Sequence, residues 1–268
     1  VAQFLKTNPE FFGERPDLLE SLLVPHPHGG RAIPLVERQM VSLREKLKGL
    51  EGKLADAPPA KSAKISYEAS PGGRHNHGGR SGFSFETAAM RADTEITGPM
   101  AAKLFVSSST ADADLFVIVR VFDPAGRELT FMGSTDPNTP IANGWLRASH
   151  RRLDPAKSTP YRPYHPHDRA EMLTPGEIYE CDVEIVTSCI VVPAGWRIAL
   201  TVRGKDYEYD GELSEFGKKF HYGTRGTGGM THADADNRPA KIYNGKVTLH
   251  AGGGRDAWLL LPVIPPKK

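Results

Sequence analysis

The sequence predicts a mainly β protein: a jelly-roll antiparallel β-sandwich with a small N-terminal α-helical or coiled-coil appendage. Glycine and proline are frequent, at 27 and 22 among 268 residues, which is typical of many short strands and turns. Apolar residues recur at the helical period up to about Asp56 and at the strand period after about Ala63. We therefore expect a helical segment at 1–56, a linker at 57–63 and the sandwich domain at 64–268.

The N-terminal segment predicts two short helices before residue 24, a loop at 25–30, and then a longer helix. Apolar residues in that longer helix follow spacings of four and three, as in a heptad seam: Val36, Met40, Leu43, Leu47, Leu50 and Leu54. A homodimer through this seam is one interpretation. The other is that the stripe packs on the chain's own helices, since Gly49 and Gly52 each cost about 1 kcal/mol of helix propensity.

Four motifs in this segment are specific enough to suggest a family. They occupy residues 1–5, 8–12, 25–30 and 35–39. Together they resemble the N-terminus of domain-of-unknown-function family 484, a bacterial family. The resemblance implies helices and a coiled coil that normally lead into a GAF-like sensor domain, but no GAF-like segment follows here.

The linker at 57–63 contains Pro58 and Pro59, which end a helix. Beyond it, short alternating segments bounded by turn residues predict antiparallel strands. The segment 115–122 is apolar at nearly every position, so we expect it to be covered on both faces. The expected strands are 64–69, 83–86, 96–109, 112–123, 128–132, 144–151, 177–186, 196–203, 241–250 and 257–264.

Five anchors in the β region occur in the order of a known family: 96–123, 144–149, 173–180, 193–200 and 258–265. They resemble the C-terminal β-domain of the X-Pro dipeptidyl-peptidase and cocaine-esterase-like (CocE/NonD) serine hydrolases, over about residues 64–268. The resemblance implies a domain that supports or shapes an active site. In that family the Ser-Asp-His triad lies on an upstream α/β-hydrolase domain.

No catalytic residue is predicted. A triad of this kind needs a Gly-x-Ser-x-Gly elbow between a strand and a helix, and the nearest candidate, 79–83, lacks the last glycine. The sequence thus leaves open whether the chain is an enzyme. We expect a non-catalytic β-domain fused to a helical dimerisation-type module. The alternatives are part of a split serine hydrolase completed by an α/β-hydrolase partner, and an adaptor or lectin-like binding module.

No metal or cofactor site is predicted either. The histidine pairs His26/His28, His75/His77 and His165/His167 lie among prolines or glycines without a nearby cysteine ligand. Two aspartate pairs, Asp112/Asp114 and Asp234/Asp236, lack the spacing of a calcium loop, so we expect solvated, turn-forming carboxylates. The glycine-rich run 223–229 lacks the Lys-Ser/Thr of a phosphate loop, which favours an ordinary loop.

An aromatic group falls in the irregular segments, where it either walls a cleft or closes the ends of the sandwich: Tyr161, Tyr164, Tyr207, Tyr209, Phe216, Phe220 and Tyr222.

Cys181 and Cys189 are expected as reduced thiols, with burial favoured by the apolar stretch around Cys181. The net charge is +2, so we expect neither a nucleic-acid nor a membrane partner. With no signal pattern and no spanning segment, the predicted location is cytoplasmic.

Overall fold

The computed structural model describes residues 23–24, 33–34, 63–68, 82–133, 136–209, 215–220, 226, 232 and 234–265. The chain divides into two compact units, Val1–Pro59 and Ala60–Lys268, and each is described by itself. In the first unit, β1 (Leu23–Val24) pairs antiparallel with β2 (Ile33–Pro34). Leu23, expected in a helix, therefore lies in a strand. The heptad positions 36–54 lie outside the described residues.

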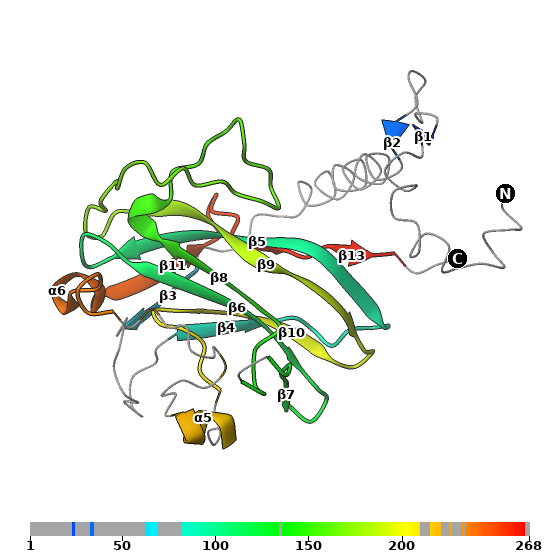
Figure 1. The fold of residues 1–268 in the computed structure, drawn as a ribbon. Helices are drawn as coiled ribbons and strands as arrows, with labels where there is room; N and C mark the ends of the chain where they lie inside the picture. Colours follow the sequence, from blue (N-terminus) through cyan, green and yellow to red (C-terminus); the bar gives the residue numbers. More distant parts are fainter. Residues whose placement is uncertain are drawn as a thin grey trace, which may run out of the picture. The chain divides into compact units, whose positions relative to one another are not determined.

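The second unit is built from two antiparallel sheets that form separate layers (Figure 1). One sheet has the order β4 (Gly82–Glu86), β10 (Arg197–Arg203), β6 (Asp114–Phe122) and β7 (Glu128–Leu129), and β8 (Ala142–Arg147) also pairs with β6. This sheet carries the short α5 (Glu215–Phe220) in the segment that follows β10. The two sheets of this unit together confirm the prediction of a mainly β, antiparallel protein.

The other sheet is organised around the long strand β5 (Thr94–Ser108). Along one side of β5 runs β9 (Tyr179–Val192), paired from Thr94↔Val192 to Val106↔Tyr179. The other side is shared by β13 (Val263–Ile264), β12 (Trp258–Leu260) and β11 (Lys246–Ala251), and β3 (Ala63–Glu68) extends the sheet beyond β11.

The main core lies between the sheets because alternate side chains of each layer point inward. Strand β6 supplies Leu115 and Val117, and β5 and β9 supply Val106 and Val183, none of which has measurable exposure. The outer face of β6 is also covered: Phe116 and Ile118 pack against Tyr207. Coverage on both faces was the prediction for this strand, and it is confirmed.

The two strands expected within 96–123 are both present, but they do not pair with each other. Strand β5 belongs to one sheet and β6 to the other, so the connection at 109–113 crosses between the layers. Sequence alternation reports which residues face a core but not which strand lies alongside, and this is why the pairing could not be foreseen.

Several element bounds differ from the expectation. Strand β8 ends at Arg147 and continues as a 3-10 turn, η1 (Ala148–His150). The segment expected as one strand at 241–250 begins instead with α6 (Ala240–Tyr243), which follows Pro239. Pro262 separates β12 from β13, since a proline cannot donate to the ladder; its carbonyl accepts a hydrogen bond from Thr97 N at 3.0 Å.

Strand β9 extends to Val192, six residues past its expected end, because β5 begins early enough to pair with all of it. The register shifts between Gly98 and Met100, where Gly98 has φ of +136°. A side chain is strained at that φ, so glycine is the residue that permits this bulge.

Candidate functional site

A buried carboxylate organises the crossing between the two sheets. Asp112 is 2% exposed. Its Oδ1 accepts hydrogen bonds from Ala113 N (2.8 Å) and Ser149 N (2.9 Å), and its Oδ2 accepts from Ser149 Oγ (2.7 Å) and Tyr243 Oη (2.9 Å). The solvated, turn-forming role expected for Asp112 is therefore wrong: its oxygens tie η1 and α6 to the crossing.

The second carboxylate of this pair is also buried, at 6% exposure for Asp114. Arg147 Nε and Nη2 donate to its two oxygens at 2.8 and 3.0 Å, and Arg238 Nε lies 2.7 Å from Oδ2. This hydrogen-bonded pairing raises the pKa of Arg147. The expectation of a solvated Asp114 is wrong too, because two guanidinium groups from distant segments converge on it.

A polar cleft of about 410 Å³ opens beside this pair, over the outer face of β6 and β8. Its walls include Asp114, Trp145, Arg147, Tyr164 and His232. It draws on β6, β8, β9 and two loops that are far apart in the sequence, which is why sequence reasoning did not identify it. The sequence itself offered only a tryptophan, Trp145, within an expected strand as a signal.

His232 and Asp206 form a hydrogen-bonded pair at this cleft. Asp206 Oδ1 lies 2.9 Å from His232 Nδ1, and Oδ2 accepts from His232 N at 2.6 Å. Burial opposes ionisation of Asp206, but these hydrogen bonds outweigh it and hold the pKa of Asp206 below its ordinary value. Among the described residues no serine or cysteine is hydrogen-bonded to His232, so within that part of the chain the pair does not extend to a nucleophile.

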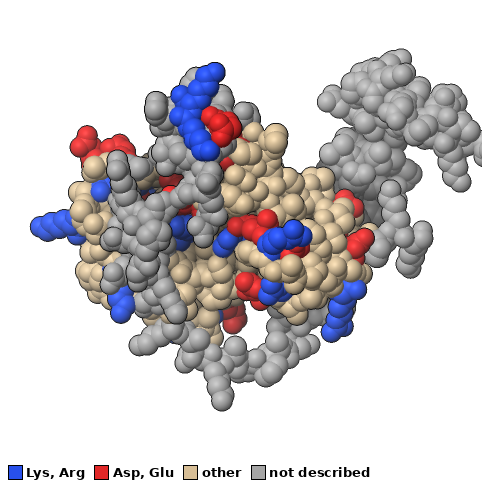
Figure 2. All heavy atoms as spheres, turned by 90° about the horizontal axis from the view of Figure 1, so that it is seen from below, with Lys and Arg blue, Asp and Glu red and all other residues tan. Residues whose placement is uncertain are grey.

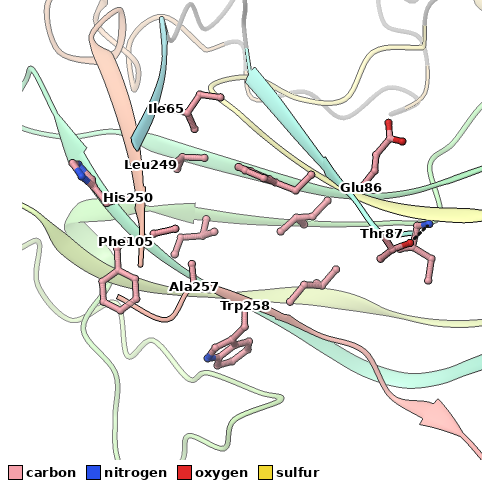
Figure 3. A pocket seen from close by; sticks show the side chains of 14 residues that line it. Ile65, Glu86, Thr87, Phe105, Leu249, His250, Ala257 and Trp258 are labelled. Atoms are coloured by element: carbon pink, nitrogen blue, oxygen red, sulfur yellow. Dashed lines mark hydrogen bonds between the residues drawn. The ribbon is translucent and has the colours of Figure 1, made fainter. Parts of the chain in front are cut away.

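A larger, apolar cavity of about 540 Å³ lies between the two sheets (Figure 3). Ile65 of β3, Leu249 of β11 and Trp258 of β12 line it from one sheet, and Phe85 of β4 lines it from the other. Phe85 is 49% exposed, so an apolar ring borders the opening. The volume falls within the range of small-molecule pockets.

The histidine pairs have different outcomes. His26/His28 and His75/His77 lie outside the described residues. His165 and His167 line the polar cleft, with ring centroids 6.0 Å apart, and His150 lies 5.2 Å from His167. Burial, together with the two neighbouring imidazoles, lowers the pKa of His167. In the described part of the chain, no cluster of three or more His, Cys, Asp or Glu is arranged to hold a metal ion.

The structure also describes parts of three other segments that the sequence raised as candidate sites. Asp234 is exposed and accepts from Asp236 N at 2.9 Å, the turn-forming role that was expected. Of the glycine-rich run, only Gly226 is described; its N donates to Asp136 Oδ2 at 2.6 Å. Of the elbow candidate, Gly82 and Phe83 begin β4, and the remainder lies outside the described residues.

The two cysteines are both free, as expected, but differ in burial. Cys181 is fully buried in the main core, and burial raises the pKa of its thiol to about 12. Cys189 is exposed, and its Sγ accepts from Thr97 Oγ1 at 3.3 Å. Burial therefore holds for Cys181 alone.

The aromatic group divides between two roles. Tyr207 is 5% exposed and packs on the outer face of β6 together with Tyr209. Tyr164 is 38% exposed and lines the polar cleft. The side chains of Phe216 and Phe220, and all of Tyr222, lie outside the described residues. Tyr164 thus lines a cleft, whereas Tyr207 and Tyr209 cover a sheet face.

The charged side chains on one face of the molecule have both signs. On the face presented in Figure 2, basic and acidic side chains are interspersed, in keeping with a net charge of +2. Within the described ranges, no helix has the length and apolar character needed to cross a membrane.

Two protein families match the chain. The family described as X-Pro dipeptidyl-peptidase C-terminal non-catalytic domain matches residues 39–218. The family described as protein of unknown function, DUF484, matches residues 1–57. Both resemblances that the motifs suggested are confirmed, and the two matches share residues 39–57.

Curated and solved relatives are much longer proteins. Putative serine esterases of Mycobacterium bovis and Mycobacterium tuberculosis are each 30% identical over 129 residues, covering 46% of this chain and 19% of the relative. The crystal structure of a CocE/NonD family hydrolase from Staphylococcus aureus is 26% identical with a TM-score of 0.61, covering 78% of this chain and 34% of the hydrolase. The chain therefore spans about a third or less of these relatives.

Proposed function

Because the chain belongs to the family of X-Pro dipeptidyl-peptidase C-terminal non-catalytic domains, we propose that it supports or shapes the active site of a serine hydrolase without carrying the catalytic groups. The observation that carries this proposal is the family match, which extends over residues 39–218. The long antiparallel strands of the second unit support it, since the hydrolase from Staphylococcus aureus shares their arrangement. The proposal includes a jelly-roll arrangement of the strands in the second unit.

A hydrolysis assay tests the non-catalytic role. Purified chain is incubated with a chromogenic ester and with an X-Pro amide, each with and without a serine-directed inhibitor. We expect no inhibitor-sensitive turnover, because the His232–Asp206 pair has no hydrogen-bonded nucleophile among the described residues. Inhibitor-sensitive hydrolysis that tracks with the chain through purification would overturn the proposal.

The second candidate is that the chain completes a split hydrolase whose partner carries the triad. The apolar cavity favours this candidate, since Phe85 at its edge is 49% exposed and exposed apolar surface is typical of a site where a partner binds. The match covers 34% of the similar hydrolase, and a partner would supply the rest of such an enzyme.

Co-expression with a candidate α/β-hydrolase from the same organism distinguishes the two. A split enzyme predicts a stable complex with ester or X-Pro amidase activity that neither chain has alone. Phe85→Asp is expected to weaken the complex, whereas Met132→Asp, at a side chain 84% exposed and outside the cavity lining, is the matched control. Two chains that elute separately and remain inactive when mixed contradict this candidate.

The N-terminal module belongs to the proposal as a helical dimerisation element acting through Val36, Met40, Leu43, Leu47, Leu50 and Leu54. The heptad spacing supports it. Sedimentation equilibrium is expected to give a dimer that becomes a monomer in Leu43→Lys/Leu50→Lys; a monomeric parent chain refutes the dimer.

A cytoplasmic location completes the proposal, supported by the free thiols of Cys181 and Cys189.

A further inference from the structure

Two large aromatic side chains line the polar cleft while remaining open to solvent. Trp145 is 43% exposed and Tyr164 is 38% exposed. Trp and Tyr are enriched at binding interfaces because their side chains combine an apolar ring with a polar group. Their common cleft also contains ionisable side chains from three strands and two loops, so it combines apolar faces with hydrogen-bonding groups.

The fold holds Trp145 in one orientation without covering it. It lies opposite Phe116 in the β6–β8 register. Its Nε1 donates to Asp206 Oδ1 at 3.3 Å, and its ring lies 5.5 Å from the imidazole of His232. His232 is itself held by Asp206 and by an edge contact with Phe116 at 5.4 Å. A ring fixed in advance loses little entropy when a ligand binds on it.

The loop that carries Tyr164 is likewise pinned by its backbone. Tyr164 N donates to Ser158 Oγ at 3.0 Å, and Tyr164 O accepts from Asp154 N at 2.9 Å. The ammonium group of Lys157 lies 4.7 Å from the centre of the tyrosine ring. The second aromatic of the cleft is thus also positioned before any ligand arrives.

Polar side chains beside these rings retain hydrogen-bonding capacity. Arg162 and Glu184 line the cleft with side chains 69% and 52% exposed, and the Arg162 Nε to Glu184 Oε1 distance is 3.7 Å. Because this distance exceeds that of a hydrogen bond, the guanidinium can still donate and the carboxylate can still accept. Such a donor and acceptor side by side match the adjacent hydroxyl groups of a sugar.

Each of the three arginines that line the cleft lies close to a carboxylate. Arg147 and Arg238 both lie on Asp114, at 2.8 and 2.7 Å, and Arg162 lies beside Glu184. A phosphate-bearing ligand needs guanidinium groups that are not already paired with carboxylates. A cationic ligand needs carboxylates that are not already paired with guanidinium groups. The arrangement therefore favours a neutral polar ligand over a nucleotide, although a base could also stack on Trp145.

We propose that the polar cleft is a binding site for a neutral carbohydrate. The C–H face of one sugar ring stacks on Trp145, Tyr164 contacts the same glycan, and Arg162 and Glu184 bond its hydroxyl groups. This binding function goes beyond the supporting role proposed above and does not depend on it, since the cleft contains no part of the apolar cavity.

The test uses the full chain on an array of neutral oligosaccharides built from common hexoses and pentoses. The best glycan is then titrated by tryptophan fluorescence and calorimetry, with adenosine monophosphate titrated in parallel. We expect saturable glycan binding with a dissociation constant of about 1 mM or tighter, and weaker binding of the nucleotide. No saturable glycan binding, or tighter binding of the nucleotide, overturns the proposal.

Variants locate the site. Trp145→Ala is expected to weaken glycan binding by about tenfold or more, since a stacked ring contributes on the order of 1.4 kcal/mol. Trp258→Ala, which removes an indole from the other cavity, is the matched control and should bind as the parent does. Trp145→Phe retains a ring and should bind with intermediate affinity, which separates loss of the platform from loss of folding. Unchanged binding in Trp145→Ala overturns the assignment.

Discussion

The two faces of β6 are stabilised in different ways. The inner face places Leu115 and Val117 in a core of apolar side chains between the sheets. The outer face begins with the carboxylate of Asp114, which holds Arg147 and Arg238. One strand thus separates an interior that depends on packing from an outer face with two parts. The first part is a polar layer that depends on paired charges, and the second is a small apolar cluster of Phe116, Ile118 and Tyr207. In the interior, added volume is destabilising. In the polar layer, the loss of a hydrogen-bond or ion-pair partner is destabilising.

Thiol labelling compares the interior with the surface and should give the largest effect. Cys181 is fully buried with a thiol pKa of about 12, whereas Cys189 is exposed. Because the thiolate is the reactive form, we expect iodoacetamide at pH 8 to modify Cys189 at least about a thousandfold faster. Mass spectrometry should find one label in the native chain and two in urea. Equal rates would show that the interior opens readily.

Removing the buried carboxylate at the sheet crossing tests the polar layer. Asp112→Ala leaves the hydroxyl groups of Ser149 and Tyr243 without their acceptor in a buried site. The free energy of unfolding, measured in urea, should fall by about 4 kcal/mol. Asp234→Ala, at an exposed carboxylate, serves as control and should change it far less. A comparable small change in both variants would contradict the role given to Asp112.

Adding one methyl group tests the packing where β8 meets β9. A Cβ on Gly144 would lie 2.1 Å from the carbonyl oxygen of Glu184, so backbone must move. Gly144→Ala should lower the free energy of unfolding by about 3 kcal/mol. Gly176→Ala, at a turn with φ of +84° and open space around it, measures conformational strain alone, at about 1 kcal/mol. If the two variants lose equal free energy of unfolding, the contact between residue 144 and the Glu184 carbonyl does not determine which residue this position accepts.

The smallest expected effect is the pH dependence contributed by the pair at the polar cleft. The folded-state pKa of Asp206 lies below its ordinary value of 3.8. Its stabilising contribution is therefore present above that ordinary value and is lost as the pH falls through the folded pKa. His232→Ala should cost about 1 kcal/mol at pH 6, and the difference from the parent should shrink toward pH 2. A difference that does not change over this range would show that Asp206 and His232 are not linked.

The sequence anticipated the interior better than the polar layer. Alternation along 115–122 predicted a strand covered on both faces, which β6 confirms. The aspartates beside it were expected in solvent, since short acidic turns are usually solvated. Their partners, Ser149, Tyr243, Arg147 and Arg238, come from distant segments. A single strand's pattern contains no information about which distant donors will reach it.

By itself, the sequence determined the class of the fold, the inward and outward alternation of its central strands, and the family, because these follow from local periodicity and ordered motifs. The tertiary structure alone decided that β5 and β6 lie in different sheets, that Asp112 and Asp114 are buried, and that Trp145, Tyr164 and His232 line one cleft. These features depend on contacts between residues far apart in the chain, and such contacts form only when the two layers pack together.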